Sequence, residues 1–338
     1  MYCEYFGVTR YPFEVSPNAD CLYAPPQYRD ALSGLSCGIL NRKGFLMLTG
    51  DAGTGKTTLC TRLTERLPPE RMQMAFIANP AVSPTELLDL LLWSLGVQDI
   101  PESKVNKWIA LNRFLKSSWE QEKIVTIIID EAHLMPVATL EEVRMLGNLF
   151  QDGVPLLQII LSGQNQLIDV MNRSDLRQFK QRIAVRVSLK ALTRPEVNEY
   201  IQFRWRRAGA TRPSPFTPEA VARIAVLSQG IPRVVNTLCD NALLIAYAGE
   251  CRRVNEAHVS EAAVDLDVAP ALVAAAAKVE PAQVAAVATP RTAQSAAPIV
   301  PVIPRVNYVE GLQTLNRYQP SELPFLVRLG RKLGFMQT

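Results

Sequence analysis

Residues 44–58, with the sequence GFLMLTGDAGTGKTT, decide the fold of this chain. Residues 44–49 form a short apolar run, which predicts a buried strand. Residues 50–57 match the pattern GxxxxGK[ST], and amphipathic residues 56–67 predict a helix that begins inside the pattern. A strand, a glycine-rich turn and a helix in this order build a loop that wraps a phosphate group. We therefore expect an α/β fold with a phosphate loop.

The loop supplies the candidate nucleotide-binding residues. Its glycines let the backbone approach a phosphate closely, and the helix N-terminus adds positive potential. We expect Lys56 to reach the β- and γ-phosphates of ATP, and Thr57 to place its hydroxyl on Mg²⁺. The candidate ATP-binding residues are Gly50, Asp51, Ala52, Gly53, Thr54, Gly55, Lys56, Thr57 and Thr58.

A second apolar run, 124–131 with the sequence IVTIIIDE, ends in two carboxylates. The carboxyl ends of parallel strands meet at one edge of a sheet, which places these acids beside the phosphate loop. We expect Asp130 to hold Mg²⁺ and Glu131 to act as the general base toward water. The letters DEAH at 130–133 also occur in a class of helicases. That class needs two α/β lobes in tandem, and only one is found in this sequence.

Strands and helices alternate along the first half of the chain, which predicts a parallel sheet with right-handed crossovers. The predicted strands are 44–49, 72–78, 123–129, 156–161 and 183–189, and the predicted helices are 27–40, 56–67, 84–95, 104–121, 140–150 and 169–181. After residue 192 only helices are expected, at 194–208, 218–228, 232–248 and 256–266. The predicted parts are 1–43 (an aromatic, proline-rich segment and the first helix), 44–190 (the α/β core), 191–268 (a helical lid), 269–304 (a linker) and 305–338 (a short C-terminal segment).

Composition supports this division. Residues 269–304 contain 13 alanines and 6 prolines among 36 residues, which is typical of a flexible linker. The net charge is +4, and residues 269–338 carry 7 basic and 3 acidic side chains, so 29 of each sign remain in the first 268. That neutrality argues against a generic polyanion binder. Six scattered cysteines without a CxxC pair favour a reducing compartment, and with no signal peptide or membrane span we expect a cytoplasmic protein.

Four further residues are candidates for the chemistry. At the end of the fourth predicted strand, Gln164 is our first choice to sense the γ-phosphate or orient water, and Ser162 is the second. Residues 173–212 hold 11 basic and 3 acidic side chains. From this strip we choose Arg182 as an arginine that stabilises transition-state charge on a neighbouring subunit's ATP. A solvated basic face and a nucleic-acid surface are the alternatives for the strip. Arg233, at the start of a lid helix, is expected to reach the γ-phosphate.

These pieces in this order resemble the AAA+ ATPases: phosphate loop, acidic strand end, strand-end sensor, arginine finger and lid arginine. More narrowly, the stretches YCEYFG at 2–7, YPF at 11–13, LQIILSGQ at 157–164 and GIPRVVNTLCD at 230–240 resemble the ExeA/GspA family of bacterial secretion-pathway ATPases. The resemblance covers about residues 1–266. It implies a P-loop three-layer sandwich with a small all-α lid, and an Mg-ATP-dependent enzyme that assembles into rings or arcs.

The resemblance carries further expectations. It implies that the N-terminal segment helps to enclose the adenine, with Tyr11, Pro12 and Phe13 as candidates. Founding members of the family continue through a membrane span into a peptidoglycan-binding domain, whereas here a linker leads to about 34 residues, so direct cell-wall work is not expected. The expected partners are further copies of the chain and an unidentified envelope or secretion component, with weak peripheral contact to the inner membrane through residues 305–338. The core is also similar to transposition regulators of the TnsC/TniB type, which makes DNA the alternative partner.

Overall fold

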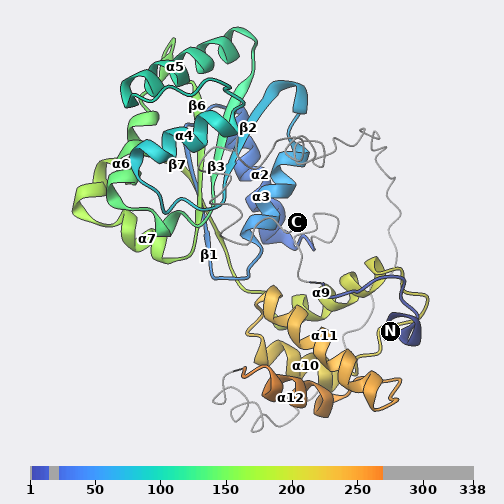
Figure 1. The fold of residues 1–338 in the computed structure, drawn as a ribbon. Helices are drawn as coiled ribbons and strands as arrows, with labels where there is room; N and C mark the ends of the chain where they lie inside the picture. Colours follow the sequence, from blue (N-terminus) through green and yellow to red (C-terminus); the bar gives the residue numbers. More distant parts are fainter. Residues whose placement is uncertain (1, 15–22, 269–338) are drawn as a thin grey trace, which may run out of the picture. The chain divides into compact units, whose positions relative to one another are not determined.

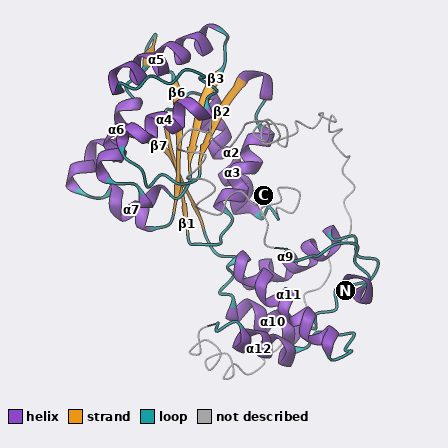
Figure 2. Ribbon diagram, viewed as in Figure 1, coloured by secondary structure: helices purple, strands orange, loops and turns teal. Residues whose placement is uncertain are grey.

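The computed structural model describes residues 2–14 and 23–268. A five-stranded, fully parallel sheet runs in the order β2-β3-β6-β1-β7 (Figures 1 and 2). Its strands are β1 Phe45–Gly50, β2 Met72–Ile77, β3 Ile124–Ile129, β6 Leu157–Gly163 and β7 Ile183–Leu189. All five strands predicted from the sequence are confirmed, to within about two residues at each end. Strand β6 lies between β1 and β3, and so separates the phosphate loop from the acidic strand end.

Alternate residues of the central strands face opposite sides of the sheet, as the pleat requires. On β1, Leu46 and Leu48 join one buried cluster and Phe45 and Met47 join the other. Strands β3 and β6 divide in the same way. Every residue of β1, β3 and β6 is buried, so these strands are covered on both faces and consist of nearly continuous apolar runs.

Helices cover both faces of the sheet (Figure 1). On one face lie α2 Pro26–Leu40 and α3 Lys56–Arg66. On the other lie α4 Pro84–Ser94, α5 Lys104–Glu120, α6 Val137–Leu146, α7 Gln166–Met171 and α8 Arg177–Arg182. The layers confirm the predicted three-layer α/β sandwich with a P-loop.

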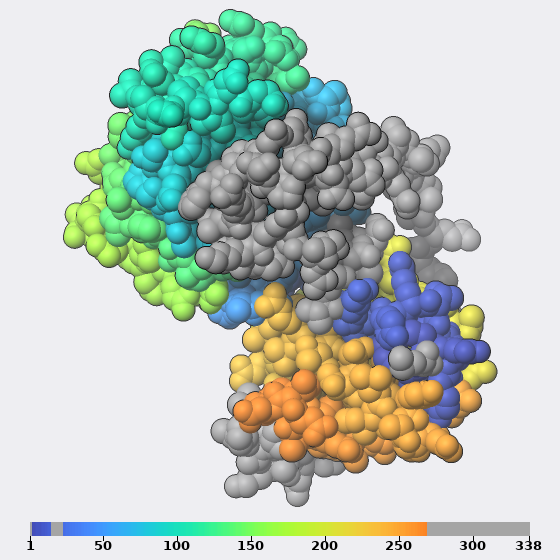
Figure 3. Space-filling view, viewed as in Figure 1, coloured from blue at the N-terminus to red at the C-terminus, as the bar shows by residue number. Residues whose placement is uncertain are grey.

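After β7 the described chain is helical. The helices are α9 Arg194–Arg207, α10 Pro218–Leu227, α11 Pro232–Ala248 and α12 Glu256–Asp265. They share a buried cluster with the N-terminal residues Tyr2, Phe6, Val8 and Phe13. Figure 3 shows this N-terminal segment, in dark blue, against the orange helices. The aromatic lead of the chain therefore packs with the lid helices, whereas α2 packs with the sheet.

Three local features differ from the sequence-based prediction. Residues Tyr2–Phe6 form a short helix, α1, in the N-terminal segment where no helix was predicted before residue 27. The helix expected to run to residue 150 ends at Leu146, and a small hairpin of β4 Phe150–Gln151 and β5 Val154–Pro155 follows. The helix expected at 169–181 is divided into α7 and α8 by a 3-10 turn at Ser174–Leu176.

The predicted linker at 269–304 and the predicted C-terminal segment at 305–338 lie outside the described residues, and so does the membrane contact expected of the latter. Within the described ranges, no helix combines the length and the apolar character that crossing a bilayer requires.

Candidate nucleotide-binding site

The phosphate loop joins β1 to α3, and glycine is required at several of its positions. Gly53 and Gly55 adopt φ of 79° and 92°, in the left-handed region that other residues avoid. At Gly50 a Cβ atom would lie 2.7 Å from the carbonyl oxygen of Leu189 on β7. The backbone is therefore free to wrap a phosphate closely, and the N-terminus of α3 begins directly at Lys56.

Lys56 lies inside this loop. Its Nζ donates hydrogen bonds to the carbonyl oxygens of Gly50 at 2.9 Å and Asp51 at 3.1 Å. Burial lowers the pKa of the Lys56 ammonium, and the nearby carboxylates of Glu131 and Asp130 oppose that shift. The cation therefore sits among carbonyl groups at the place where a phosphate chain would pass.

Asp130 is the centre of a hydrogen-bond network that fits a magnesium ion. Thr57 Oγ1 donates to Asp130 Oδ2 at 2.6 Å, and Ser162 Oγ donates to Asp130 Oδ1 at 2.7 Å. The backbone N–H of Glu131 also donates to Oδ1, at 3.0 Å. The hydroxyl and the carboxylate predicted to hold Mg²⁺ are thus in direct contact, and oxygen ligands are those that Mg²⁺ prefers.

The protein offers few ligands beyond these two. In the described part of the chain, no group of three or more His, Cys, Asp or Glu side chains could hold a metal. Mg²⁺ keeps several waters and is usually held by one or two protein oxygens together with substrate phosphates. The donor set around Asp130 therefore fits a nucleotide-bound Mg²⁺ better than a resident metal.

Glu131 follows Asp130 in a left-handed conformation, with φ of 51°. Its side chain is 40% exposed, and its Oε2 lies 3.4 Å from Nδ1 of His133. His133 Nδ1 also faces the backbone N–H of Gln164 at 3.4 Å. His133 therefore lies beside Glu131 and links it to the end of β6.

The end of β6 positions the two predicted sensors on different partners. The Ser162 hydroxyl is fully buried and contacts Asp130 directly. The backbone N–H of Gln164 instead faces Nδ1 of His133. The next residue, Asn165, was not predicted. Its Nδ2 donates a hydrogen bond to Asp51 Oδ1 of the phosphate loop at 2.6 Å. Within the loop, Thr54 Oγ1 donates to the carbonyl oxygen of Asp51 at 2.8 Å.

Arg233 contacts the phosphate loop from the start of α11. Its backbone N–H faces the Gly53 carbonyl oxygen at 3.3 Å. A Cβ atom on Gly53 would lie 2.8 Å from Arg233 Cβ and 3.1 Å from Ile231 Cγ2. The Arg233 charge also contributes to lowering the pKa of Lys56, after the larger effect of burial. The lid arginine and the phosphate loop are therefore in contact.

Arg182 ends α8 and is exposed. Its Nη1 donates to Asn148 Oδ1 at 2.5 Å, on the loop after α6. It contacts none of the phosphate-loop residues in the same chain. An arginine that serves a neighbouring subunit needs this exposure, and the trans role stays a prediction.

The N-terminal candidates are held by the lid helices. Phe13 is fully buried with its ring 5.8 Å from that of Phe216, and Arg204 Nε donates to the Pro12 carbonyl oxygen at 2.7 Å. Tyr11 is half exposed and packs on Tyr2. None of these contacts involves the phosphate loop, so the role in enclosing adenine stays a prediction.

A different aromatic residue lies against the loop. The hydroxyl oxygen of Tyr28, on α2, would be 3.1 Å from a Cβ atom on Gly55. Tyr28 is buried, and burial raises the pKa of its phenol. It was not predicted, because the sequence places it in an ordinary apolar helix face.

Comparison with known proteins agrees with this geometry. Residues 40–171 match the AAA domain family. Over 268 residues the chain is 36% identical to General secretion pathway protein A of Aeromonas hydrophila. Residues 40–171 therefore match an AAA domain, and the chain is similar over most of its length to a protein of the ExeA/GspA family. The matched region is 79% of this chain and 48% of the relative, so the chain spans about half the length of the relative it matches.

Solved structures with a similar fold include replication proteins. Cdc6p of Pyrobaculum aerophilum has a TM-score of 0.60 at 17% identity, with 77% of this chain and 72% of that one covered. The Aeropyrum pernix ORC2 protein in its ADPNP–ADP complexes has a TM-score of 0.56 at 18% identity, with 77% and 73% covered. The ORC1 protein of the same organism in complex with DNA has a TM-score of 0.55 at 19% identity, with 72% and 67% covered. At these identities the likeness shows a shared fold.

Proposed function

We propose that this chain binds Mg-ATP and hydrolyses it to ADP and phosphate. The observation that carries the proposal is the Thr57–Asp130–Ser162 hydrogen-bond network beside a phosphate loop that encloses Lys56. The ADPNP and ADP of the similar ORC2 structure support adenine nucleotide as the ligand. Thr57 and Asp130 would hold Mg²⁺, which would draw charge from the β- and γ-phosphates.

The chain's own groups have distinct tasks in this proposal. Backbone N–H groups of the loop and the Lys56 ammonium bind the phosphate oxygens and stabilise charge as the bond to the leaving group breaks. Glu131 takes a proton from the attacking water, and its carboxylate is partly exposed, as that contact requires. Ser162 holds the Asp130 carboxylate in place. Arg233 would report the state of the nucleotide to the lid through its contact with Gly53.

We propose further that the site is completed between subunits of a ring or arc, with Arg182 supplied in trans. Its guanidinium is exposed and contacts no phosphate-loop residue of its own chain. The similarity to General secretion pathway protein A supports a role in a bacterial secretion or envelope-assembly system. We propose the cytoplasmic side of the inner membrane as the place of this role.

The alternative is a DNA-associated regulator of the TnsC/TniB type. The excess of basic residues in 173–212 favours it, and the similar ORC1 protein was solved in complex with DNA. Binding through such a strip would weaken steeply with salt, because it releases counterions from the phosphate backbone.

One experiment separates these proposals. Steady-state ATPase activity is measured against protein concentration, with and without duplex DNA, at low and moderate salt. Specific activity that rises with protein concentration and ignores DNA supports the secretion role and shared sites. Stimulation by DNA that disappears with salt supports the regulator. No ATP turnover under any condition contradicts the enzymatic proposal.

A further inference from the structure

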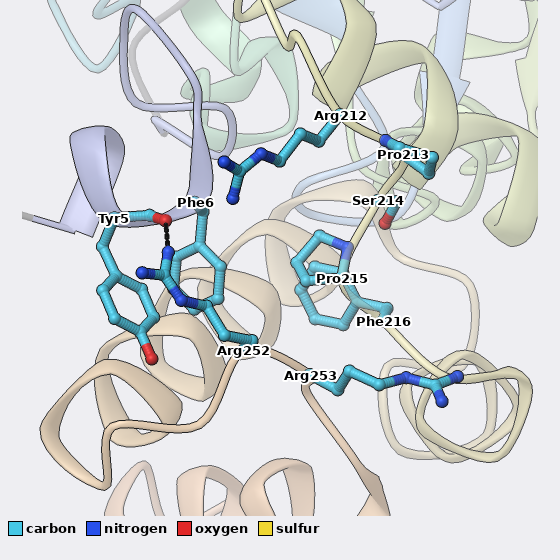
Figure 4. Close-up of a pocket in the computed structure, with 9 residues that line it drawn as sticks. All are labelled: Tyr5, Phe6, Arg212, Pro213, Ser214, Pro215, Phe216, Arg252 and Arg253. Atoms are coloured by element: carbon cyan, nitrogen blue, oxygen red, sulfur yellow. Dashed lines mark hydrogen bonds between the residues drawn. The ribbon is translucent and has the colours of Figure 1, made fainter.

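A pocket far along the chain from the phosphate loop lies where the N-terminal helix meets the lid (Figure 4). Its volume is about 410 Å³. The lining combines three arginines with aromatic and proline side chains: Tyr5, Phe6, Arg212, Pro213, Ser214, Pro215, Phe216, Arg252 and Arg253. None of these residues takes part in the proposed ATPase chemistry.

The pocket is built on a fixed backbone. The Val254 N–H donates to the Pro215 carbonyl at 3.0 Å, and the Thr217 N–H donates back to Val254 at 2.9 Å. These bonds tie the 212–217 loop to the 252–254 segment. The Thr211 N–H donates to the Gly7 carbonyl at 3.0 Å, and this joins the loop to the end of α1. The backbone of the lining is therefore held in position before any ligand arrives, which lowers the entropy cost of binding.

Among the described residues, Arg252 uses only one of its hydrogen-bond donors. Its guanidinium stacks on the Tyr5 ring at 3.8 Å, and one N–H group of Nη1 donates to the Tyr5 carbonyl oxygen. Arg212 and Arg252 direct their guanidinium groups toward Tyr5 and Phe6, and Arg253 extends in the opposite direction (Figure 4). Two planar donors on one side of a pocket suit a carboxylate or a phosphate oxygen.

Among the described residues, no carboxylate forms a close ion pair with these arginines. Within 4 Å, none forms an ion pair with Arg212, Arg252 or Arg253, nor with Arg10, Arg206 or Arg207 on the neighbouring segments. The hydroxyl of Ser214, in the pocket wall, is buried and has no hydrogen-bond partner among the described residues. An anion that also carries a hydrogen-bond donor or acceptor would pair with the guanidinium groups and with the Ser214 hydroxyl.

The rest of the lining selects the kind of anion. Phe6 and Phe216 are buried side chains that face the pocket together with Pro215. The backbone of duplex DNA presents phosphates along a convex surface. It offers no apolar group that would fill a recess with an apolar lining. A peptide that carries an apolar side chain next to an acidic one would fill the recess and reach the guanidinium groups together.

We propose that this pocket binds an acidic peptide segment of a partner protein, with a carboxylate on Arg212 and Arg252 and an adjacent apolar side chain against Phe6, Pro215 and Phe216. The site would dock a partner on the lid, separately from the nucleotide. Because its test measures binding alone, the proposal does not depend on ATP hydrolysis.

The test uses the full chain and a fluorescein-labelled peptide of about 12 residues, in which glutamates alternate with phenylalanine and proline. Fluorescence anisotropy at physiological salt should show saturable binding. Arg212→Glu should weaken it about tenfold or more, since a charge-assisted bond is replaced by repulsion. The matched control is Arg206→Glu, which makes the same charge change on an exposed arginine outside the pocket. Because salt screens charges beyond a Debye length of ~8 Å, this variant should change the affinity less than about threefold. Ser214→Ala should weaken binding without adding repulsion.

Each alternative outcome overturns the proposal. Binding that Arg206→Glu and Arg212→Glu weaken equally would mean diffuse electrostatic attraction. Equal binding of a peptide with glutamine in place of glutamate would remove the role of the carboxylate. No binding of the probe up to about 1 mM, or Arg212-dependent binding of duplex DNA alone, would leave a different ligand class. Thermal unfolding and ATP binding of the variants, expected to match the parent chain, exclude misfolding as the cause.

Discussion

At the scale of single residues, Glu131 and Asp130 are neighbours with separate tasks. Asp130 is held by the hydroxyls of Thr57 and Ser162, whereas the Glu131 carboxylate is partly exposed beside His133. Glu131→Gln should therefore keep ATP bound and slow its hydrolysis by roughly 10²–10⁴-fold, the usual contribution of a general base. Binding is measured by titration with a fluorescent ATP analogue, and turnover by phosphate release. Glu141→Gln is the control, because Glu141 is a partly exposed carboxylate on α6 that pairs with Arg144. Retained hydrolysis in the Glu131 variant would exclude Glu131 as the base.

Gly53 tests the contact between the lid and the phosphate loop. Gly53→Ala places a Cβ atom 2.8 Å from Arg233, at a φ of 79°. Gly153→Ala is a matched control, because Gly153 has a φ of 78° and no atom lies within 4 Å of the added carbon. Both variants should lose about 1–2 kcal/mol through the left-handed backbone. Only Gly53→Ala should also bind ATP about tenfold more weakly. Equal ATP affinity in the two variants would contradict a role for the lid contact.

The residue scale is also where the sequence was least informative about the site. The motif located Lys56, Thr57, Asp130 and Glu131, because a phosphate loop and an acidic strand end have fixed chemistry and spacing. It could not locate Tyr28 or Asn165, which reach the loop from elements distant in sequence. Such contacts depend on how α2 and β6 pack, and no local pattern encodes that. A polar residue directly after a buried strand is the one signal that could have drawn attention to Asn165.

At the scale of elements, helix α4 illustrates a start that the sequence specifies. Ser83 accepts a hydrogen bond from the Glu86 N–H, and the Glu86 carboxylate accepts one from the Ser83 N–H. Ser83→Ala should destabilise the chain by about 1 kcal/mol (0.5–2). Ser103→Ala is the matched control, since Ser103 precedes α5 without a capping bond and its loss should cost little. The free energies of unfolding, measured with urea, decide the comparison. Equal losses would mean that the capping bond contributes nothing.

The same cap should depend on pH. The bonds from the backbone and side chain of Ser83 lower the pKa of Glu86 below its ordinary value. A carboxyl whose folded-state pKa is lowered stabilises the fold above its unfolded pKa, and that contribution is lost as the pH falls through the folded-state value. The difference in unfolding free energy between the parent chain and Glu86→Gln should therefore shrink on acidification from neutral pH to below about pH 4. A difference that does not change with pH would contradict the link.

Long, periodic elements were predictable, and short ones were not. The strands and most helices were placed within a few residues, because apolar runs and helical spacing extend over many positions. The β4–β5 hairpin has only two residues in each strand, too few for a period to show. Its turn at Asp152 and Gly153, both with positive φ, carried the Asp-Gly signal of a tight hairpin, which the longer helical pattern around it obscured. Helix α1 is likewise too short for periodicity and depends on aromatic packing.

At the scale of the whole molecule, the open question is whether one chain holds a complete site. The Arg182 side chain is bonded to Asn148 and not to the phosphate loop, Asp130 or Glu131 of its own chain. A site completed by a neighbour predicts that two inactive variants restore activity when mixed. Arg182→Ala keeps Glu131 and lacks the arginine, whereas Glu131→Gln has the reverse defect. In a randomly mixed assembly about one site in four would combine both intact groups.

Mixing the two variants in equal amounts should therefore raise ATPase activity from near zero to at most about a quarter of the parent's specific activity. The gain should appear only at concentrations where the chain oligomerises, as followed by light scattering. Asn148→Ala is the control, because it removes the hydrogen-bond partner of Arg182 and leaves the guanidinium free, so activity should be retained. If the Arg182 variant alone is fully active, the trans role is wrong. If the Arg182 variant is inactive and mixing restores no activity in a demonstrated oligomer, Arg182 acts within its own subunit. Oligomerisation would then be needed for binding the partner protein and not for ATP hydrolysis.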